Sequence, residues 1–180
     1  ISSSITFDQV NKLPKLQNQY TQGSSNEYTP YATRSWGAKG DTMAWDGITT
    51  DALDKNGNLV SKNDPTAKTA FKPYDNMNSF FKTGITTSNN ISISGGTDQG
   101  NFRIAFTNLH QDGIIPLSKL DKNTFTLAGE HKIGKIASIS GNASYTNSAT
   151  SGNLQGNNTS GVMYGVYRTP NSFDNRNGLT

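Results

Sequence analysis

The sequence of 180 residues contains no cysteine, only two histidines and no long apolar segment. The absence of cysteine excludes disulfide bonds, thiolate metal ligands and cysteine nucleophiles, and it is compatible with any compartment. No apolar run approaches the roughly 20 residues that a transmembrane helix needs. The net charge is +3, but the basic residues are scattered. No stretch therefore predicts a track for a phosphate backbone, and nucleic-acid binding is not expected.

Sequence motifs of catalysis and metal binding are also lacking. There is no Gly-x-Ser-x-Gly motif, no phosphate-binding glycine loop and no arrangement that predicts a Ser-His-Asp triad. His110 and His131 have no neighbours in the sequence that resemble metal ligands. The segment 54–58 resembles a calcium loop only faintly, because its glycine stands fourth and Pro65 occupies the place of the closing glutamate. We therefore predict no catalytic residue, no metal site and no cofactor.

Apolar residues are scarce as well, at 32% of the chain, with a mean hydropathy of −0.64. Nearly half of a typical soluble domain is apolar, so this composition is meagre for a packed core. Disorder has such a composition, but phenylalanine and isoleucine that recur with a period of two argue against it. A membrane β-barrel has the same composition, because its apolar residues face outward and its interior and loops are polar.

Residues 90–147 alternate between apolar and polar side chains in four short segments, which predicts strands with one apolar and one polar face. The apolar set is Ile91, Ile93, Phe102, Ile104, Phe106, Phe125, Leu127, Ile139 and Tyr145. The polar set is Ser92, Arg103, Thr107, Thr124, Thr126, Glu130, Ser138, Asn142 and Ser144. The pattern predicts an antiparallel meander.

The predicted strands are separated by connections that alternate in length. We expect strands at residues 1–8, 89–95, 101–109, 123–133 and 136–147. The connections 9–88 and 148–180 are long, the connection around 110–122 is of medium length, and those near 96–100 and 134–135 are short. Outer-membrane barrels alternate in this way, with short periplasmic turns and long extracellular loops. The predicted fold class is therefore all-β, as part of a large antiparallel transmembrane β-barrel.

The first long connection, 9–88, is too long for an idle loop, so we expect it to be functional or internally folded. Asn56-Gly57 lies between two apolar pairs and predicts a tight hairpin turn. Asp75 predicts the N-cap of a short helix over the residues that follow it. Five strands cannot close a barrel, and the pattern begins at Ile1 without a methionine. We expect the chain to be a piece of a longer protein.

The order of several short motifs resembles the SusC/RagA family, the TonB-dependent transporters of the Bacteroidetes outer membrane. One of them is Ser35-Trp36-Gly37. The matching stretches are 13–20, 35–37, 80–84, 89–96, 100–103, 108–116 and 122–125. Each is weak alone, but their combined order is specific and covers nearly all of 1–147, whereas 148–180 matches less well.

The resemblance implies a plugged barrel of about 22 strands, of which this chain would supply the first five or so. It implies import of oligosaccharides or peptides, captured with a SusD-like surface lipoprotein and driven by the TonB complex. The plug, the TonB box and the rest of the barrel are absent from this chain. The implied location is the bacterial outer membrane, with the wall in lipid and the long loops extracellular.

Aromatic residues in the long loops are candidates for contacts with a ligand or partner. Trp36 and Trp45 either stack on a sugar or grip the partner lipoprotein, or they are packing anchors of a folded loop. Tyr164, Tyr167 and Arg168 form a Tyr/Arg cluster among small polar residues, which suits polar ligand contacts. Ordinary loop packing is the alternative for this cluster too.

Arg103, Glu130 and Lys132 follow the polar parity of their strands, so in a barrel they would face the lumen. They would either contact the plug or remain solvated. A different architecture stays open from the residues alone, namely a soluble secreted β-sandwich such as an adhesin or a carbohydrate-binding module. That fold needs a second set of apolar strands, which 20–70 and 148–180 do not obviously supply.

Overall fold

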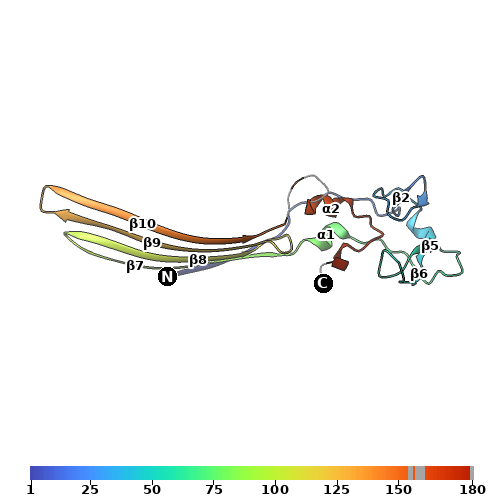
Figure 1. Ribbon diagram of the computed structural model, residues 1–180, viewed down its shortest axis with the longest axis horizontal. Coiled ribbons are helices and arrows are strands. Elements are labelled where there is room, and N and C mark those ends of the chain that lie inside the picture. The colour runs from blue at the N-terminus through green and yellow to red at the C-terminus, as the bar shows by residue number, and fades with distance from the viewer. Residues whose placement is uncertain (154–155, 157–160, 179–180) are drawn as a thin grey trace. The chain divides into compact units, whose positions relative to one another are not determined.

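The computed structural model describes residues 1–153, 156 and 161–178 (Figure 1). The chain divides into two compact units. We call residues 1–10 and 82–153 the sheet unit, and residues 11–81 with 154–180 the loop unit. Each unit is built from more than one stretch of the chain, so its contacts join residues that are far apart in the sequence.

The sheet unit is one open antiparallel sheet in the order β1-β7-β8-β9-β10. Its strands are β1 (Ser2–Asp8), β7 (Gly84–Thr97), β8 (Gly100–Asp112), β9 (Lys119–Ile133) and β10 (Ala137–Ser151). The last four strands run side by side as long, curved ribbons (Figure 1). The predicted all-β, antiparallel class is confirmed.

The observed strands extend beyond their predicted ends. β7 begins at Gly84 rather than at 89, and β10 continues to Ser151 rather than to 147. The connection between β8 and β9 shrinks correspondingly. Serine and threonine dominate the stretches added to β7 and β10, and they look like loop residues in the sequence. The backbone ladder holds them in strands nevertheless, because its hydrogen bonds do not depend on the side chain.

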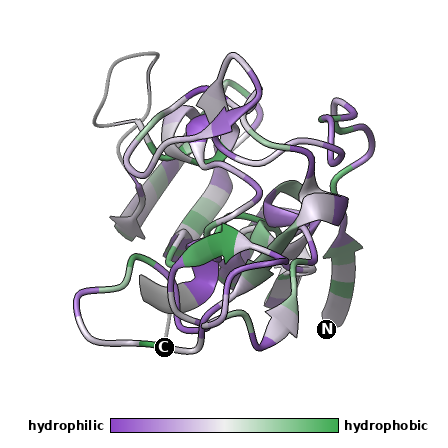
Figure 2. Ribbon diagram, turned by 90° about the vertical axis from the view of Figure 1, so that its right-hand side faces the viewer, coloured by the Kyte–Doolittle hydropathy of each residue, from purple (hydrophilic) through white to green (hydrophobic). Residues whose placement is uncertain are grey.

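The register sorts the side chains of the sheet unit into two faces, because direct cross-strand partners point to the same side. The predicted apolar and polar sets fall on opposite faces without exception. We call them the apolar face and the polar face. Figure 2 shows the alternation as bands of contrasting colour along the strand at the N-terminus.

Rows of matched residues cross the apolar face. Ile91, Phe106, Phe125 and Tyr145 form one row, which is largely aromatic. The next row joins Ser3 and four asparagines, Asn89, Asn108, Asn123 and Asn147. Asn108 Nδ2 donates to Asn123 Oδ1 at 2.8 Å, and Ser3 Oγ donates to Asn89 Oδ1 at 2.6 Å. The apolar face therefore changes to polar character at an aromatic border.

The loop unit contains two small sheets and four short helices. The sheets join β2 (Gly23–Ser24) to β3 (Glu27–Tyr28), and β4 (Met43–Trp45) to both β5 (Leu59–Ser61) and β6 (Thr69–Ala70). The helices are η1 (Gly40–Thr42), α1 (Asn76–Phe80), α2 (Val162–Arg168) and η2 (Asn175–Gly178). Among the described residues, no helix is long and apolar enough to cross a membrane.

The core of the loop unit is a small cluster of Met43, Trp45, Leu59 and Phe71, with Tyr28, Ala38 and Tyr74 packed against it. The long first connection is therefore internally folded. Asp75 caps α1 as predicted, since its carboxylate accepts the Asn78 N–H at 3.1 Å. The predicted tight turn at Asn56-Gly57 is present, but the apolar pairs on its two sides do not form a hairpin with each other. Gly57 closes a tight turn onto Asp54, but β5 pairs with β4 and not with the residues just before the turn.

Candidate functional site

The two tryptophans of the loop unit have opposite environments. Trp45 is 4% exposed and its ring lies 5.8 Å from that of Phe71 in the core. Its interpretation as a ligand- or partner-contacting residue is therefore corrected, and it is a packing anchor. Trp36 is 61% exposed, and its ring lies 5.5 Å from that of Tyr20 at an angle of 45°. Of the two, only Trp36 presents an aromatic face.

Helix α2 carries the predicted Tyr/Arg cluster. The Arg168 guanidinium lies 5.2 Å from the centre of the Tyr164 ring, one helical turn away. Arg168 also donates to Thr33 Oγ1 at 2.8 Å, so its charge is engaged within the loop unit. Tyr167 is half exposed. The structure therefore joins Tyr164 and Arg168 but leaves Tyr167 apart.

Arg103, Glu130 and Lys132 lie on the polar face of the sheet, as their parity predicts. Arg103 is opposite Ala128, and Lys132 is opposite Ser138. Within the described residues, none of the three forms an ion pair with another side chain. They are separate charges on a face made mostly of serine, threonine and asparagine.

A turn at residues 17–20 is fixed by a single side chain, that of Gln17. Its amide nitrogen, Nε2, donates to the carbonyls of Tyr20 at 3.0 Å and Ser35 at 2.6 Å. Its Oε1 accepts the N–H groups of Gln19 and Tyr20, both at 2.9 Å. One glutamine therefore ties the turn to itself and to the residue before Trp36. This side chain holds the Tyr20–Trp36 pair in place.

We call the ring pair of Tyr20 and Trp36 the aromatic platform. Trp36 is 61% exposed, so the platform is open to solvent. The backbone beneath it is paired, because Gly37 N–H donates to Thr21 O at 2.9 Å and Trp36 N–H donates to Gly23 O at 3.2 Å. Rigid aromatic residues that are exposed in this way are the usual anchors of binding sites, because little entropy is lost when they make contacts.

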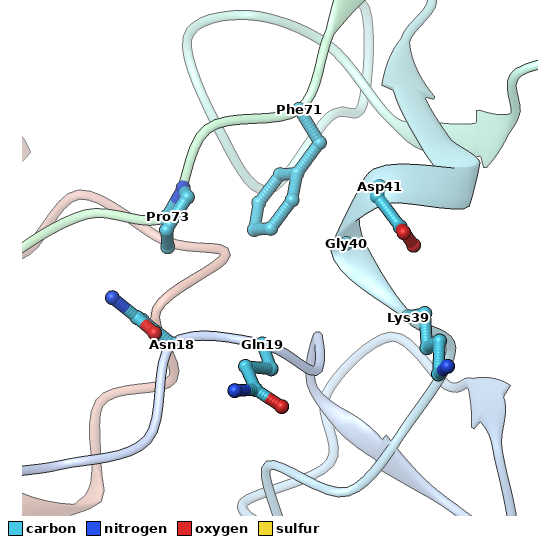
Figure 3. Close-up of a pocket in the computed structure, with 7 residues that line it drawn as sticks. All are labelled: Asn18, Gln19, Lys39, Gly40, Asp41, Phe71 and Pro73. Carbon is cyan, nitrogen blue, oxygen red and sulfur yellow. The ribbon is translucent and has the colours of Figure 1, made fainter.

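A pocket of about 360 Å³ opens beside the same turn (Figure 3). Its lining residues are Asn18, Gln19, Lys39, Gly40, Asp41, Phe71 and Pro73. The Phe71 ring points into the space between Pro73 and Gly40, with the Gln19 amide below it (Figure 3). The pocket therefore combines an apolar floor with side-chain amides and one charge of each sign.

Two glycines of this region lie so close to neighbouring groups that a side chain would not fit. A Cβ at Gly37 would lie 2.2 Å from Gln22 O, which explains why the Ser-Trp-Gly motif needs glycine. A Cβ at Gly40 would lie 2.8 Å from the Phe71 ring. Gly40 N–H donates to Gln19 O at 2.8 Å, so the backbone touches both walls of the pocket. The shape of the pocket depends on the missing side chain at Gly40.

The segment 161–178 is joined to the first long connection through Asp174, which is 1% exposed. Lys55 Nζ donates to its Oδ2 at 2.7 Å, and Arg176 donates to both of its carboxylate oxygens at 2.9 and 3.0 Å. The Asp174 N–H donates to Asp54 Oδ2 at 3.1 Å. We call these four residues the carboxylate clasp. It unites two distant parts of the sequence in one folded unit.

Asparagine and serine side chains reinforce the same junction. Asn76 Nδ2 donates to the carbonyls of Pro170 at 3.0 Å and Phe173 at 2.8 Å. Asn171 Nδ2 donates to Tyr20 O at 3.0 Å, which links the segment 161–178 to the aromatic platform. Ser172 Oγ donates to Gln22 Oε1 at 2.8 Å. The turn at 17–20 is therefore supported from two sides.

The pKa values of two groups at the clasp, the Asp174 carboxyl and the Tyr74 phenol, are shifted in opposite directions. Hydrogen bonds from Arg176, joined by Lys55, hold the pKa of the Asp174 carboxyl well below its ordinary value, although burial acts the other way. Burial and the hydrogen bond to Asp54 raise the pKa of the Tyr74 phenol well above its ordinary value. Tyr74 therefore donates to Asp54 Oδ1, at 3.0 Å, as a neutral group.

The histidines differ from each other more than the sequence indicates. His110 lies between two carboxylates, in contact with Asp121 through Nδ1 and 3.4 Å from Asp112 Oδ2 through Nε2. The expectation that His110 has no neighbour resembling a metal ligand is wrong, because Asp112 follows two residues later on β8 and the register of β8 with β9 brings Asp121 opposite. In the part of the chain that the structure describes, no group of three or more histidine, aspartate or glutamate side chains is arranged to hold a metal ion.

Sequence reasoning missed Gln17, the pocket and the carboxylate clasp. The amide-rich run at 17–22 was visible, but nothing in it marks Gln17 as a brace rather than a solvated residue. Asp54 and Asp174 are 120 residues apart in the sequence, so only the fold brings them together. Comparison with models of protein families finds no match for the chain, and a search of curated proteins finds no match either.

Proposed function

We propose that the chain is part of a SusC/RagA-like, TonB-dependent transporter of a bacterial outer membrane. In this proposal the sheet unit is a segment of a barrel of about 22 strands, with its apolar face toward lipid and its polar face toward the lumen. The loop unit is extracellular and helps to capture an oligosaccharide or peptide with a SusD-like lipoprotein. The TonB complex drives import through parts outside this chain.

The uncovered apolar face is the observation that carries the proposal. Its large side chains are between 39% exposed, at Ile104, and 68% exposed, at Tyr145. Soluble monomers rarely expose contiguous apolar patches of more than a few hundred Å².

The apolar band also crosses the sheet obliquely. At one end Ile85 on β7 shares a row with Ser151 on β10, yet the large apolar residues of β10 begin only at Tyr145. At the other end Ile93 on β7 shares a row with Ala143, and the band on β10 continues to Ile139. Thr87 and Asn89 interrupt the band on β7.

This offset gives the angle between the band and a line drawn perpendicular to the strands, which equals the tilt of the strands if the band is level with the membrane. Four to six residues over three strand-to-strand steps correspond to an inclination of roughly 40–55°, at about 3.3 Å per residue and about 4.8 Å between strands. Strands of membrane barrels are tilted by roughly 35–45°. A band that is level with a membrane would therefore run obliquely across the register in about this way.

The soluble β-sandwich finds less support. A sandwich would need a second sheet whose apolar residues cover the apolar face. The three-stranded sheet β5-β4-β6 contributes Met43, Trp45 and Leu59 to the core of the loop unit itself. Those side chains are buried in that core and therefore do not cover the apolar face.

Membrane extraction and heat-modifiable gel mobility test the proposal on the intact protein. We expect the protein to remain in the membrane until detergent is added, and to shift in mobility on heating, as folded barrels do. Ile104→Arg should lower the folded fraction more than tenfold, since a charge near the bilayer midplane costs about 2–4 kcal/mol. Thr126→Arg is the matched control, because Thr126 lies on the polar face of the neighbouring strand.

An intact protein that stays soluble and monomeric without detergent would overturn the proposal in favour of the sandwich. Equal folded yields for Ile104→Arg and Thr126→Arg would show that the apolar face does not meet lipid. A transporter that folds in the membrane but needs no lipoprotein would leave the barrel intact and remove the SusD-like partner.

A further inference from the structure

We propose that the aromatic platform and the adjoining pocket form one binding site for a neutral oligosaccharide. The site extends over the turn at 17–20, with Trp36 on one side and Phe71 on the other. The inference rests on the proposed function only for the fate of the ligand, which is import. The binding itself is a property of the loop unit.

The platform offers an aromatic face that the fold does not use. Trp36 is 61% exposed although the same unit buries Trp45 to 4% exposure. Gln17 and the paired backbone fix the position of Trp36, so binding does not have to order it. A rigid amphipathic ring of this kind suits the apolar face of a sugar ring, while the hydroxyl groups of the sugar point to polar neighbours.

The pocket supplies those polar neighbours. Asn18 and Gln19 offer amides, which both donate and accept hydrogen bonds, as hydroxyl groups also do. Lys39 and Asp41 contribute one charge of each sign, so the lining has no net charge that would attract a charged ligand. Its volume of about 360 Å³ lies at the lower end of the range for small-molecule sites.

The two parts adjoin through consecutive residues. Gln19 lines the pocket and Tyr20 belongs to the platform. Lys39, which also lines the pocket, forms a β-bridge with Tyr20. A ligand that occupies both parts therefore has at least two rings, one against Trp36 and one beside Phe71. This predicts an oligosaccharide rather than a monosaccharide.

A peptide fits this site less well. Extended peptides are usually bound by an open strand edge, through main-chain hydrogen bonds. Here the backbone groups beside the pocket are already paired, as Thr21 N–H donates to Ala38 O at 2.9 Å and Gly40 N–H donates to Gln19 O at 2.8 Å. The side-chain amides remain as the main hydrogen-bonding groups.

The two tryptophans allow a direct test on the intact protein, in detergent if it is a membrane protein and in buffer if it is not. The signal of each tryptophan is isolated as the difference between the wild-type protein and Trp36→Phe or Trp45→Phe. Iodide should quench the fluorescence of exposed Trp36, while buried Trp45 serves as a reference for the fold. The probes are maltohexaose, cellohexaose and xylohexaose, with hexaalanine for comparison. We expect at least one hexasaccharide to protect Trp36 from iodide, and hexaalanine to give no protection.

Variants measured by calorimetry separate the two parts of the site. Trp36→Ala should weaken binding of the protecting hexasaccharide about tenfold, as removal of an interface anchor does, with little effect on its monosaccharide. Gly40→Ala should weaken binding of both, because the new Cβ displaces Phe71. Tyr31→Ala is the matched control and should change nothing, since Tyr31 is 78% exposed and lines neither part.

Three results would overturn the inference. One is the absence of protection by all three hexasaccharides, with Trp45 still shielded. Another is protection by hexaalanine, which would make the site a peptide site. The third is an unchanged affinity in Trp36→Ala. None of these depends on membrane insertion, so a failure here is distinct from a failure of the transporter proposal, which extraction and heat modification decide.

Discussion

The sheet unit and the loop unit treat their large apolar side chains in opposite ways. In the sheet unit Phe102, Phe106 and Phe125 are each more than 40% exposed, at 46%, 43% and 46%. In the loop unit Phe71 and Phe80 are 8% and 7% exposed. Both units have a polar composition, so composition does not separate them. The difference lies in whether the apolar residues converge on one another or line one side of a sheet.

This contrast indicates two different surroundings. The loop unit completes its own core, braces its turns with side-chain amides and pairs its buried carboxylate with two cations. It behaves as a unit folded in water. The sheet unit leaves an ordered apolar face without a protein partner in the described residues, and its stability requires something that covers that face. Lipid is the cover that we propose.

The same substitution in both units should give the largest difference. Phe71→Ala removes a ring from the core of the loop unit, and we expect it to destabilise that unit by about 3–5 kcal/mol. Phe125→Ala, on the apolar face, should leave the loop-unit transition where it is. Urea unfolding followed by the fluorescence of Trp45 measures both. A shift of similar size in the two variants would contradict the division into two units.

Removal of the buried charge comes next. Asp174→Asn should destabilise the loop unit by about 1.5–3 kcal/mol at pH 7, because four hydrogen bonds lose their ionised acceptor. The pKa of Asp174 is lower in the folded state, so this stabilisation is present above the ordinary aspartate pKa of about 3.9 and is lost as the pH falls below it.

Urea unfolding at a series of pH values measures this effect. The gap between the wild-type protein and Asp174→Asn should be constant above about pH 5 and narrow below about pH 4. Asp51→Asn, on an exposed carboxylate, is the control and should give no gap. A gap that widens in acid would mean that Asp174 is not ionised in the folded protein.

Two glycines sharpen the comparison at the level of the backbone. Gly37→Ala forces a Cβ to within 2.2 Å of Gln22 O, so we expect a loss of about 1–3 kcal/mol in the loop unit. Gly141→Ala, on the apolar face, meets nothing within 4 Å and should be neutral. Thermal unfolding and folded yield report on the two variants. A tolerated Gly37→Ala would show that this part of the loop unit can relax.

The smallest expected effect concerns Tyr74. Tyr74→Phe keeps the ring and loses the hydrogen bond to Asp54, which should cost about 0.5–1.5 kcal/mol at pH 7. The pKa of the phenol is raised in the folded state, so its contribution is complete below about pH 10 and is lost as the pH rises further. Alkaline unfolding of the wild-type loop unit should therefore begin near pH 10 and be less steep in Tyr74→Phe.

Alternation along the strands made the sheet unit predictable, because a period of two is local information. From Ile91 to Tyr145 it gave the strands, their pairing and both faces. It failed at the ends of β7 and β10, where serine and threonine carry no apolar signal. His110 shows the next limit, since its acidic contact with Asp121 depends on the register between two strands.

The loop unit was predictable only where a local rule applies, as at the Asp75 cap. Trp45 and Trp36 look alike in the sequence, and only the fold separates the buried ring from the exposed one. Helix α2 has a glycine in its middle and no capping side chain at Gly161, so its sequence gives a weak signal. The carboxylate clasp joins residues that are 120 positions apart in the sequence, which no local pattern can reveal.

Site-directed spin labelling tests most directly whether the apolar face meets lipid. The chain has no cysteine, so Leu127→Cys and Thr126→Cys each report on one position, on adjacent residues of β9 that point to opposite faces. In the membrane-embedded protein, we predict that a nitroxide at 127 is accessible to oxygen but not to a water-soluble nickel complex. A nitroxide at 126 should not show this combination. Equal accessibility at the two positions, or a nitroxide at 127 that is shielded from both reagents, would contradict the account.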